Sequence, residues 1–214
     1  HFKIGLNWDK SWTDKIILSS YGFYSFRDFY GKLPFENGGI IDLTRNYFGL
    51  GSRLNYKIGK NNLQLAAELL DQSDQRDRYL NILGSQGSNS FSQEEKFQNF
   101  SFSILDELKL EALFFRLSLR YDDMRLGTDS FSQGQIYQVI NPSLGVSYEL
   151  TPFQHVYANF STSFETPTLS ELSANPSGGE GFNFELIPSE AISYELGWKG
   201  PVSYTHLRAH ETRS

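Results

Sequence analysis

Apolar and polar residues alternate along much of this chain. In residues 2–9, every even position is apolar and every odd position is lysine, glycine, asparagine or aspartate. A period of two places apolar side chains on one face of an extended strand and polar side chains on the other. The pattern therefore predicts β-strands rather than helices. It recurs in residues 48–58 (with a lapse at Ser52), 113–122, 143–150, 156–164 and 192–199.

Weaker runs bring the total to about nine strands, each long enough for the roughly 9 to 11 residues that a tilted strand needs to cross a bilayer. These runs cover residues 15–30, 62–82 and 99–109. Short turns on one side and long loops on the other are typical of outer-membrane barrels. We expect short connections at residues 9–14, 59–61, 110–112 and 151–154, and long connections at residues 31–45, 83–98, 127–138 and 167–190.

A soluble β-sandwich also alternates, but its strands average only about five or six residues. Aromatic residues crowd near the predicted strand ends, as in Trp8 and Trp12, and barrels place such residues in girdles at the two membrane interfaces. The polar face carries charges such as Arg53 and Glu149, which would be costly inside a dry core. They fit a wet or plugged lumen, or the exposed face of a soluble sheet. We predict an all-β, antiparallel transmembrane barrel.

The ends of the chain suggest that this barrel is partial. A complete bacterial single-chain barrel has an even number of strands, whereas nine is odd. The chain begins at His1, and its only methionine is Met124. Residues 202–212, VSYTHLRAHET, resemble a translated transposase-type sequencing adapter. We therefore expect residues 1–200 to be an internal piece of a larger barrel and residues 201–214 to be a non-native tail. Alone, this piece is expected to form an open, curled sheet, or one closed by an artificial seam.

Composition and charge exclude several classes of protein. The 19 basic and 25 acidic residues give a net charge of −6, so no basic field is present to hold nucleic acid. The absence of cysteine excludes disulfide frameworks, thiolate zinc sites and cysteine nucleophiles. Aromatic residues make up 15% of the chain, too many for a disordered segment. No apolar run is long enough for a spanning helix.

Residues 141–200 resemble the barrel of TonB-dependent outer-membrane receptors, the plugged 22-stranded transporters. Four segments match that family in order and spacing, with departures: Ser163-Phe164-Glu165-Thr166-Pro167 stands where the family often has Gly-Phe-Arg-Ala-Pro, and Asn183-Phe184-Glu185-Leu186 stands for Asn-Pro-x-Leu. The preceding 140 residues match only in style. The matching segments are Tyr157 to Ser161, Phe164 to Leu172, Asn183 to Pro188 and Tyr194 to Gly200.

The resemblance implies about nine strands of a 22-stranded barrel in a bacterial outer membrane, surrounded by lipid and lipopolysaccharide. It implies active import of a scarce ligand, with TonB acting through a plug domain outside this chain. A ferric siderophore is the favoured ligand; cobalamin, another metal chelate and a saccharide are the alternatives. Haem-type receptors hold a histidine between the two central motifs, and residues 168–182 contain none, which disfavours haem.

We predict no catalytic residue, metal site or cofactor. His155 is expected in a short turn without a partner at metal-ligand spacing. The acid pairs Glu94-Glu95 and Asp122-Asp123 are expected on solvated surface, and residues 178–181, GGEG, in a surface loop. The alternatives to a receptor are a passive porin and a barrel enzyme active at its rim. A plain porin would not explain the paired central motifs.

Ligand contact is expected on the side of the long loops, near strand tips. Arginine presents five donors in a fixed fork that suits carboxylate, catecholate or phosphate groups, and tyrosine can stack on a ligand. For each candidate the alternative is a lipopolysaccharide-facing or girdle position. The candidates are Tyr30, Arg45, Arg76, Arg78, Tyr79, Arg125 and Tyr137.

Overall fold

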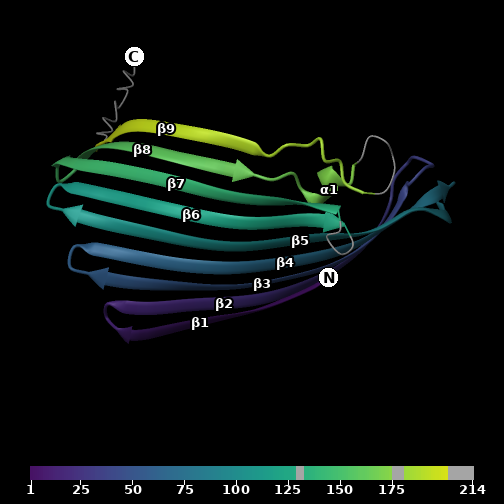
Figure 1. The fold of residues 1–214 in the computed structure, drawn as a ribbon, viewed down its shortest axis with the longest axis horizontal. Coiled ribbons are helices and arrows are strands. Elements are labelled where there is room, and N and C mark those ends of the chain that lie inside the picture. Colours follow the sequence, from purple (N-terminus) through teal and green to yellow (C-terminus); the bar gives the residue numbers. More distant parts are fainter. Residues whose placement is uncertain (129–132, 175–180, 202–214) are drawn as a thin grey trace, which may run out of the picture.

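The chain folds as a single antiparallel sheet in which strands follow one another in chain order (Figure 1). The computed structural model describes residues 1–128, 133–174 and 181–201. The all-β prediction and the expected number of strands are confirmed. The elements are β1 (Phe2–Thr13), β2 (Ile16–Lys32), β3 (Ile40–Ile58), β4 (Asn61–Ile82), β5 (Ser85–Leu110), β6 (Leu113–Thr128), β7 (Gln133–Thr151), β8 (Gln154–Glu165), the short helix α1 (Leu169–Leu172) and β9 (Ser189–Lys199).

The sheet is open. In the described part of the chain, β1 pairs only with β2 and β9 pairs only with β8, so the two strands lie at opposite edges. This confirms the expected open sheet, whose edge strands have unpaired backbone groups. The predicted tail, residues 202–214, lies outside the described residues.

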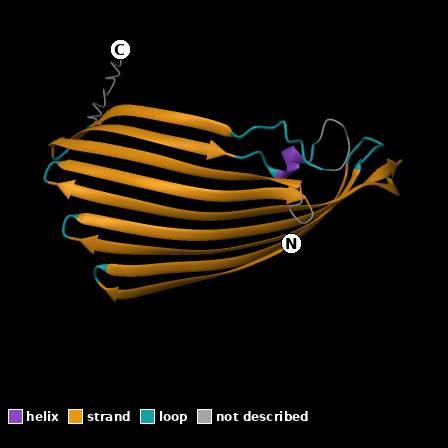
Figure 2. Cartoon of the chain, in the orientation of Figure 1, coloured by secondary structure: helices purple, strands orange, loops and turns teal. Residues whose placement is uncertain are grey.

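The four predicted short connections are tight turns at one end of the sheet, on the left in Figure 2. Each joins two strands through two residues between their printed bounds. In the β3–β4 turn, Gly59 has a φ of 58°, a left-handed conformation that glycine adopts at no steric cost. The turn residues are Asp14–Lys15, Gly59–Lys60, Glu111–Ala112 and Pro152–Phe153.

At the opposite end, three of the four predicted long loops are shorter than expected. β4 and β5 continue to a two-residue turn, Leu83–Gly84, where residues 83–98 were expected to form a loop. Both turn residues have positive φ, 50° and 88°, as in a type I′ hairpin turn. The expected loop 31–45 shortens to residues 33–39, and the connection expected at 127–138 shortens to residues 129–132, which lie outside the described residues.

The physical reason is that the alternation of polarity disappears beyond the exposed apolar part of the sheet, whereas the backbone pairing continues. Residues 72–82 and 85–97 are mostly polar on both faces. They nevertheless pair in register as one antiparallel ladder with two irregularities near Tyr79. A sequence of polar residues therefore resembles a loop but forms the long hairpin that projects on the right in Figure 1.

The two faces of the sheet differ as the alternation predicts. One face carries exposed apolar side chains: Leu50 is 54% exposed, Leu117 51% and Leu196 85%. Exposed apolar surface of this extent fits contact with lipid. On β6 the apolar positions of this face span residues 113–121, close to the length that a tilted strand needs to cross a bilayer.

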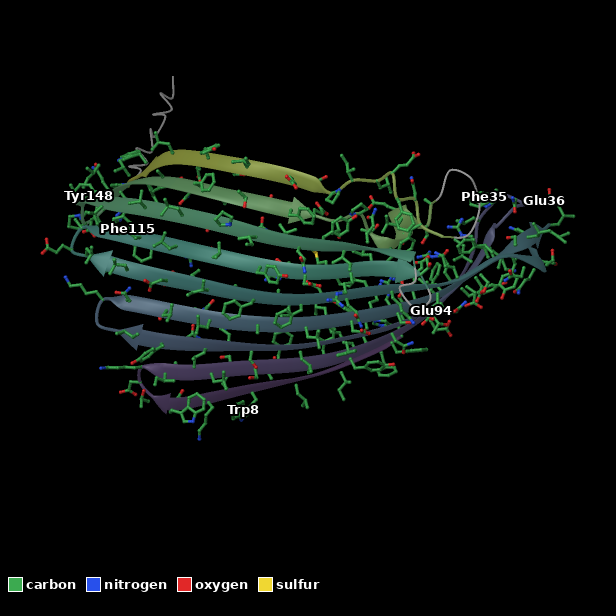
Figure 3. The ribbon with its side chains drawn as sticks, in the orientation of Figure 1. Trp8, Phe35, Glu36, Glu94, Phe115 and Tyr148 are labelled. Carbon is green, nitrogen blue, oxygen red and sulfur yellow. The ribbon has the colours of Figure 1, made fainter. Side chains whose placement is uncertain are left out.

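Polar and aromatic residues border this lipid face. At the border away from the short turns, Gln98 donates a hydrogen bond to Asp71 (2.6 Å), and Gln138 donates one to Asp123 (2.8 Å). At the short-turn end Phe115 and Tyr148 lie together (Figure 3), as expected for an aromatic girdle. The lipid face thus has two defined edges.

The opposite, polar face carries charged groups that bridge several strands. The Tyr21 hydroxyl of β2 donates to the Glu68 carboxylate of β4, passing over Gly51 of β3. Arg120 of β6 lies 4.0 Å from Glu68. A Cβ at Gly51 would lie 2.4 Å from the Tyr21 ring. Glycine is therefore required here so that the tyrosine can cover the backbone and reach its partner.

We expect Gly51→Ala to destabilise the membrane-inserted protein by about 1 to 3 kcal/mol, because overpacking displaces the Tyr21 ring from Glu68. The measurement is the temperature at which the folded band converts to the unfolded band in a gel-shift assay. Gly5→Ala is the control, since a Cβ there meets its nearest atom at an ordinary 3.6 Å. Equal stability of the two variants would contradict the prediction.

Candidate functional site

The connection between β8 and β9 begins with helix α1 at the end of the sheet away from the short turns (Figure 1), and its described side chains contact the polar face. Its helix α1 begins with a capping box. The Thr168 N–H and hydroxyl donate to Glu171 Oε2 at 2.8 and 2.9 Å, and the Glu171 N–H donates to Thr168 Oγ1 at 3.2 Å. Reciprocal bonds of this kind satisfy backbone donors that a helix start leaves free. They also hold the pKa of Glu171 below its usual value, the backbone N–H having the largest effect.

An apolar cluster attaches this connection to the sheet. Leu169, Leu172 and Phe182 pack with Leu126 of β6, and each is buried. Among the described residues these side chains form the hydrophobic core cluster, on the same sheet face as the charged residues. Leu172 and Leu126 are 0% and 1% exposed. Partly buried side chains surround the cluster: Phe97, Met124, Tyr137 and Leu186.

Two ion pairs with buried carboxylates lie beside this cluster. Arg45 of β3 donates to both carboxylate oxygens of Asp74 on β4, at 2.7 and 2.6 Å. Arg76 of β4 donates to both oxygens of Glu95 on β5, at 2.7 and 3.0 Å. Both carboxylates have no solvent exposure. Bidentate geometry is the strongest arrangement for an arginine and a carboxylate, so each charge is neutralised locally.

The Arg76–Glu95 pair also binds the β8–β9 connection. The Ser173 hydroxyl, just after α1, donates to Glu95 Oε1. Arg76 Nη2 lies 3.3 Å from the Ser170 hydroxyl oxygen, to which it donates. Gln93, opposite Arg76 on β5, donates to Ser173 Oγ at 3.4 Å.

The second limb of the connection binds the same patch. The backbone N–H of Gly181 donates to Gln93 Oε1 at 2.5 Å. The two limbs also bond to each other, since the Asn183 N–H donates to the Leu172 carbonyl at 2.7 Å. We refer to Arg76, Gln93, Glu95 and Ser173 as the loop clamp.

The sequence prediction of solvated acid pairs is wrong for one member of each pair. Neighbouring residues of a strand point to opposite faces, so Glu95 and Asp122 are buried whereas Glu94 and Asp123 lie on the other face. Asp122 accepts two bonds from Arg120, each at 2.8 Å. Spacing in the sequence could not reveal the partners of Glu95, because Arg76 and Ser173 come from another strand and from the β8–β9 connection.

All seven predicted ligand residues lie within strands rather than in loops. The register divides them between the two faces: Arg45, Arg76, Arg78 and Tyr137 lie on the polar face, and Tyr30, Tyr79 and Arg125 lie on the opposite face. Tyr30 donates to Gln86 at 3.2 Å, and Arg125 pairs with Asp123 at 2.9 Å. Ligand contact by any of these residues stays a prediction.

The four residues on the polar face have different surroundings. The guanidinium groups of Arg45 and Arg76 are already bound by carboxylates. Arg78 lies over the Phe91 ring at 5.6 Å, and its buried Nε has no partner among the described residues. Tyr137 packs against Phe164, with 5.8 Å between ring centroids. Arg78 and Tyr137 thus combine polar groups with aromatic surface.

An open cavity of about 400 Å³ separates the start of the connection from the sheet. One wall consists of residues 166–170, and the other includes Arg45, Gln72, Phe97 and Leu126. Guanidinium, amide, hydroxyl and aromatic groups therefore surround one space at this end of the polar face.

The remaining sequence candidates provide no metal or catalytic site within the described ranges. His155 lies in β8 opposite Glu149 and Lys199. It is the second residue of that strand, so the prediction that it lies in the turn is wrong. Of residues 178–181, only Gly181 is described. The described residues include no group of three or more histidine, cysteine or acidic side chains that could hold a metal ion. Within the same ranges, no helix has the length and apolarity to span a membrane.

We expect Arg45→Met to cost about 3 to 5 kcal/mol of unfolding free energy, because it leaves the buried Asp74 carboxylate without its cation. Arg125→Met is the matched control. It removes an exposed pair on the other face, so its cost should stay within about 1 kcal/mol. Urea unfolding in phospholipid vesicles measures both. If both variants lost a similar amount of unfolding free energy, the Arg45–Asp74 pair would contribute no more to stability than an exposed pair does.

Comparison with known proteins identifies the family. Residues 1–209 match the family model described as TonB dependent receptor-like, beta-barrel. The matched range extends beyond Gly200, which we predicted to be the last native residue. That residues 201–214 are a non-native tail stays a prediction. The vitamin B12 transporter BtuB of Vibrio vulnificus (strain CMCP6) is 41% identical over 58 residues, which cover 27% of this chain and 8% of that protein.

Solved structures share the fold. The ferric citrate transporter FecA in its unliganded form superposes with a TM-score of 0.72 at 20% identity, covering 92% of this chain and 32% of that chain. The copper transporter OprC gives 0.67 at 14% identity, covering 94% and 36%. Pseudomonas aeruginosa FpvA, bound to a heterologous pyoverdine, gives 0.66 at 14%, covering 94% and 30%.

The chain thus spans about a third of the length of these solved receptors. Members of the matched family are outer-membrane β-barrel receptors, and the neighbours are transport receptors rather than enzymes. Because the family model matches nearly the whole chain, this chain belongs to the TonB-dependent receptor family.

Proposed function

We propose that this chain forms part of an outer-membrane receptor that imports a scarce ligand with energy supplied by TonB. The observation that carries the proposal is the family match over residues 1–209. The exposed apolar face supports a position in lipid, next to lipopolysaccharide on the outer side. The β8–β9 connection folded over the polar face supports a shaped entrance at the end away from the short turns.

TonB would act through a plug domain outside this chain. The polar face offers charged groups for such a plug near the short turns. An open cavity of about 610 Å³ at that end is lined by Arg116, Glu149 and Lys199 among other residues. A plug with complementary polar groups could bind there without closing a dry, apolar interface.

A ferric siderophore is the ligand that we favour. The names of the neighbours include ferric citrate and iron-bound pyoverdine, and they also include copper and vitamin B12. At the proposed entrance, the Arg78 guanidinium against Phe91 and the Tyr137 ring against Phe164 suit an anionic, partly aromatic chelate. Cobalamin, another metal chelate and a saccharide are the alternative ligands.

A strain without its own iron-chelate receptors, expressing the receptor that contains this segment, tests the proposal. Ferric citrate, a ferric catecholate and vitamin B12 are supplied separately as labelled probes. We expect uptake of an iron chelate that disappears when TonB is deleted. Uptake that persists without TonB would favour the passive porin, and uptake of vitamin B12 alone would favour cobalamin as the ligand.

We further expect Arg78→Gln to weaken binding of the accepted iron chelate about tenfold or more, because a charge-assisted hydrogen bond contributes roughly 1.5 to 3 kcal/mol. Arg53→Gln is the matched control, because Arg53 lies on β3 near the short turns, and it should leave affinity unchanged. Equilibrium binding to outer-membrane preparations measures both. Equal affinities would remove Arg78 from the ligand site.

A further inference from the structure

We propose that Glu95 is a positioning residue that holds the described limbs of the β8–β9 connection, residues 166–174 and 181–188, as a fixed wall of the ligand entrance throughout binding and transport. The inference rests on the proposed function, since it assigns a role to that receptor's entrance. It concerns the mechanical state of the connection and does not depend on which ligand enters.

Contacts within the sheet hold the sheet side of the loop clamp in place. Arg76 lies directly opposite Gln93 in the β4–β5 ladder, and Glu95 is two residues further along the same strand face. Backbone pairing fixes the separation of these three side chains. The bidentate pair between Arg76 and Glu95 then fixes the direction of both charged groups. The sheet therefore presents a preorganised patch of donors and acceptors.

The connection meets this patch at two separate points. Ser173 reaches Glu95 and Gln93 from the first limb, and Gly181 reaches Gln93 from the second. The bond between Asn183 and Leu172 joins the limbs. Since both limbs attach to one patch, movement of either limb breaks bonds in both.

Burial strengthens the attachment. Leu172 has no solvent exposure and Phe182 is 4% exposed, so lifting the connection would return both side chains to water. It would also open the buried carboxylate of Glu95 to solvent on the side that Ser173 covers. The hydrogen bonds of the loop clamp and the apolar contacts of Leu172 and Phe182 thus both oppose movement of the described limbs away from the sheet.

The clamp sets the shape of the entrance cavity. Residues 166–170, directly before the clamped segment, form the wall that faces Arg45, Gln72 and Phe97. Release of Ser173 would move this wall relative to the sheet. Loss of the clamp should therefore change how a ligand is held while the strands of the barrel remain paired.

The first test compares Glu95→Gln with Glu94→Gln, its neighbour on the opposite face, in the complete receptor in outer-membrane vesicles. Glu94 bonds to Ser73 and Lys96 and does not touch the connection in the described structure. Ser173→Ala is the second variant, because it leaves the Arg76–Glu95 pair intact. We expect protease cleavage within the connection to become tenfold or more faster in Glu95→Gln and Ser173→Ala, and to stay unchanged in Glu94→Gln.

The second test locks the connection. The chain contains no cysteine, so Gln93→Cys with Ser173→Cys provides a unique pair for a short bismaleimide cross-linker. The probe is ferric citrate. We expect the cross-linked receptor to take it up at least as fast as the same variant without cross-linker, because the two substitutions remove clamp bonds that the cross-link replaces. Arrest of uptake by the cross-link would overturn the fixed wall, because it would show that the connection must move.

The outcomes separate the two proposals. Equal cleavage rates in all variants would overturn the clamp whatever the ligand. Absence of ferric citrate uptake by the unmodified receptor would count against that ligand only, and the cleavage rates would still decide the clamp. In a receptor that takes up ferric citrate, Glu95→Gln should raise the half-saturating concentration about tenfold and leave the maximal rate unchanged, as expected for a residue that positions a binding wall.

Discussion

The structure depends on one constraint: a backbone N–H or carbonyl group inside a bilayer must find its partner within the protein. Continuous antiparallel pairing from β1 to β9 satisfies that requirement for every interior strand. Once the backbone is committed to pairing, each side chain has only two directions, toward lipid or toward the polar face. The separation of Leu117 from Arg116, or of Leu196 from Glu195, follows from this restriction rather than from any local preference.

The polar face carries many charges on one surface. Unpaired, such charges would produce large unfavourable electrostatic fields. Several of its arginines contact carboxylates, as Arg45 of β3 contacts Asp74 of β4 and Arg120 contacts Asp122 within β6. Where two side chains bond across an intervening strand, a small residue can lie between them. Gly51 of β3 lies between Tyr21 of β2 and Glu68 of β4 in this way. Arginines matched in this way are less available to a ligand, which narrows the search for ligand contacts to groups such as Arg78 that are arranged differently.

The sequence predicted most of the fold but little of the site. Alternation in residues 113–121 and 143–150 is strong because one face meets lipid, so strands, faces and short turns could be located. The signal disappears in residues 85–97, where both faces are polar, although the backbone pairs there as well. The Thr168-x-x-Glu171 capping box was visible in the sequence as a helix-start pattern and could have placed α1. The hydrogen bond between Ser173 and Glu95 was not visible in the sequence, because the two residues are 78 positions apart and meet only through the tertiary structure.

The long β4–β5 hairpin has a consequence for how such a receptor tolerates insertions and deletions. Because side chains alternate with a period of two, adding one residue to a paired strand exchanges the faces of every residue beyond it. Adding two residues to each of the two strands restores the faces, keeps the pairs in register and lengthens the hairpin by one repeat. Beyond the lipid border, the length of this projection can thus vary in steps of two while Arg76 and Glu95, nearer the membrane, keep their places. The reach of the receptor into its surroundings can change independently of the shape of its entrance.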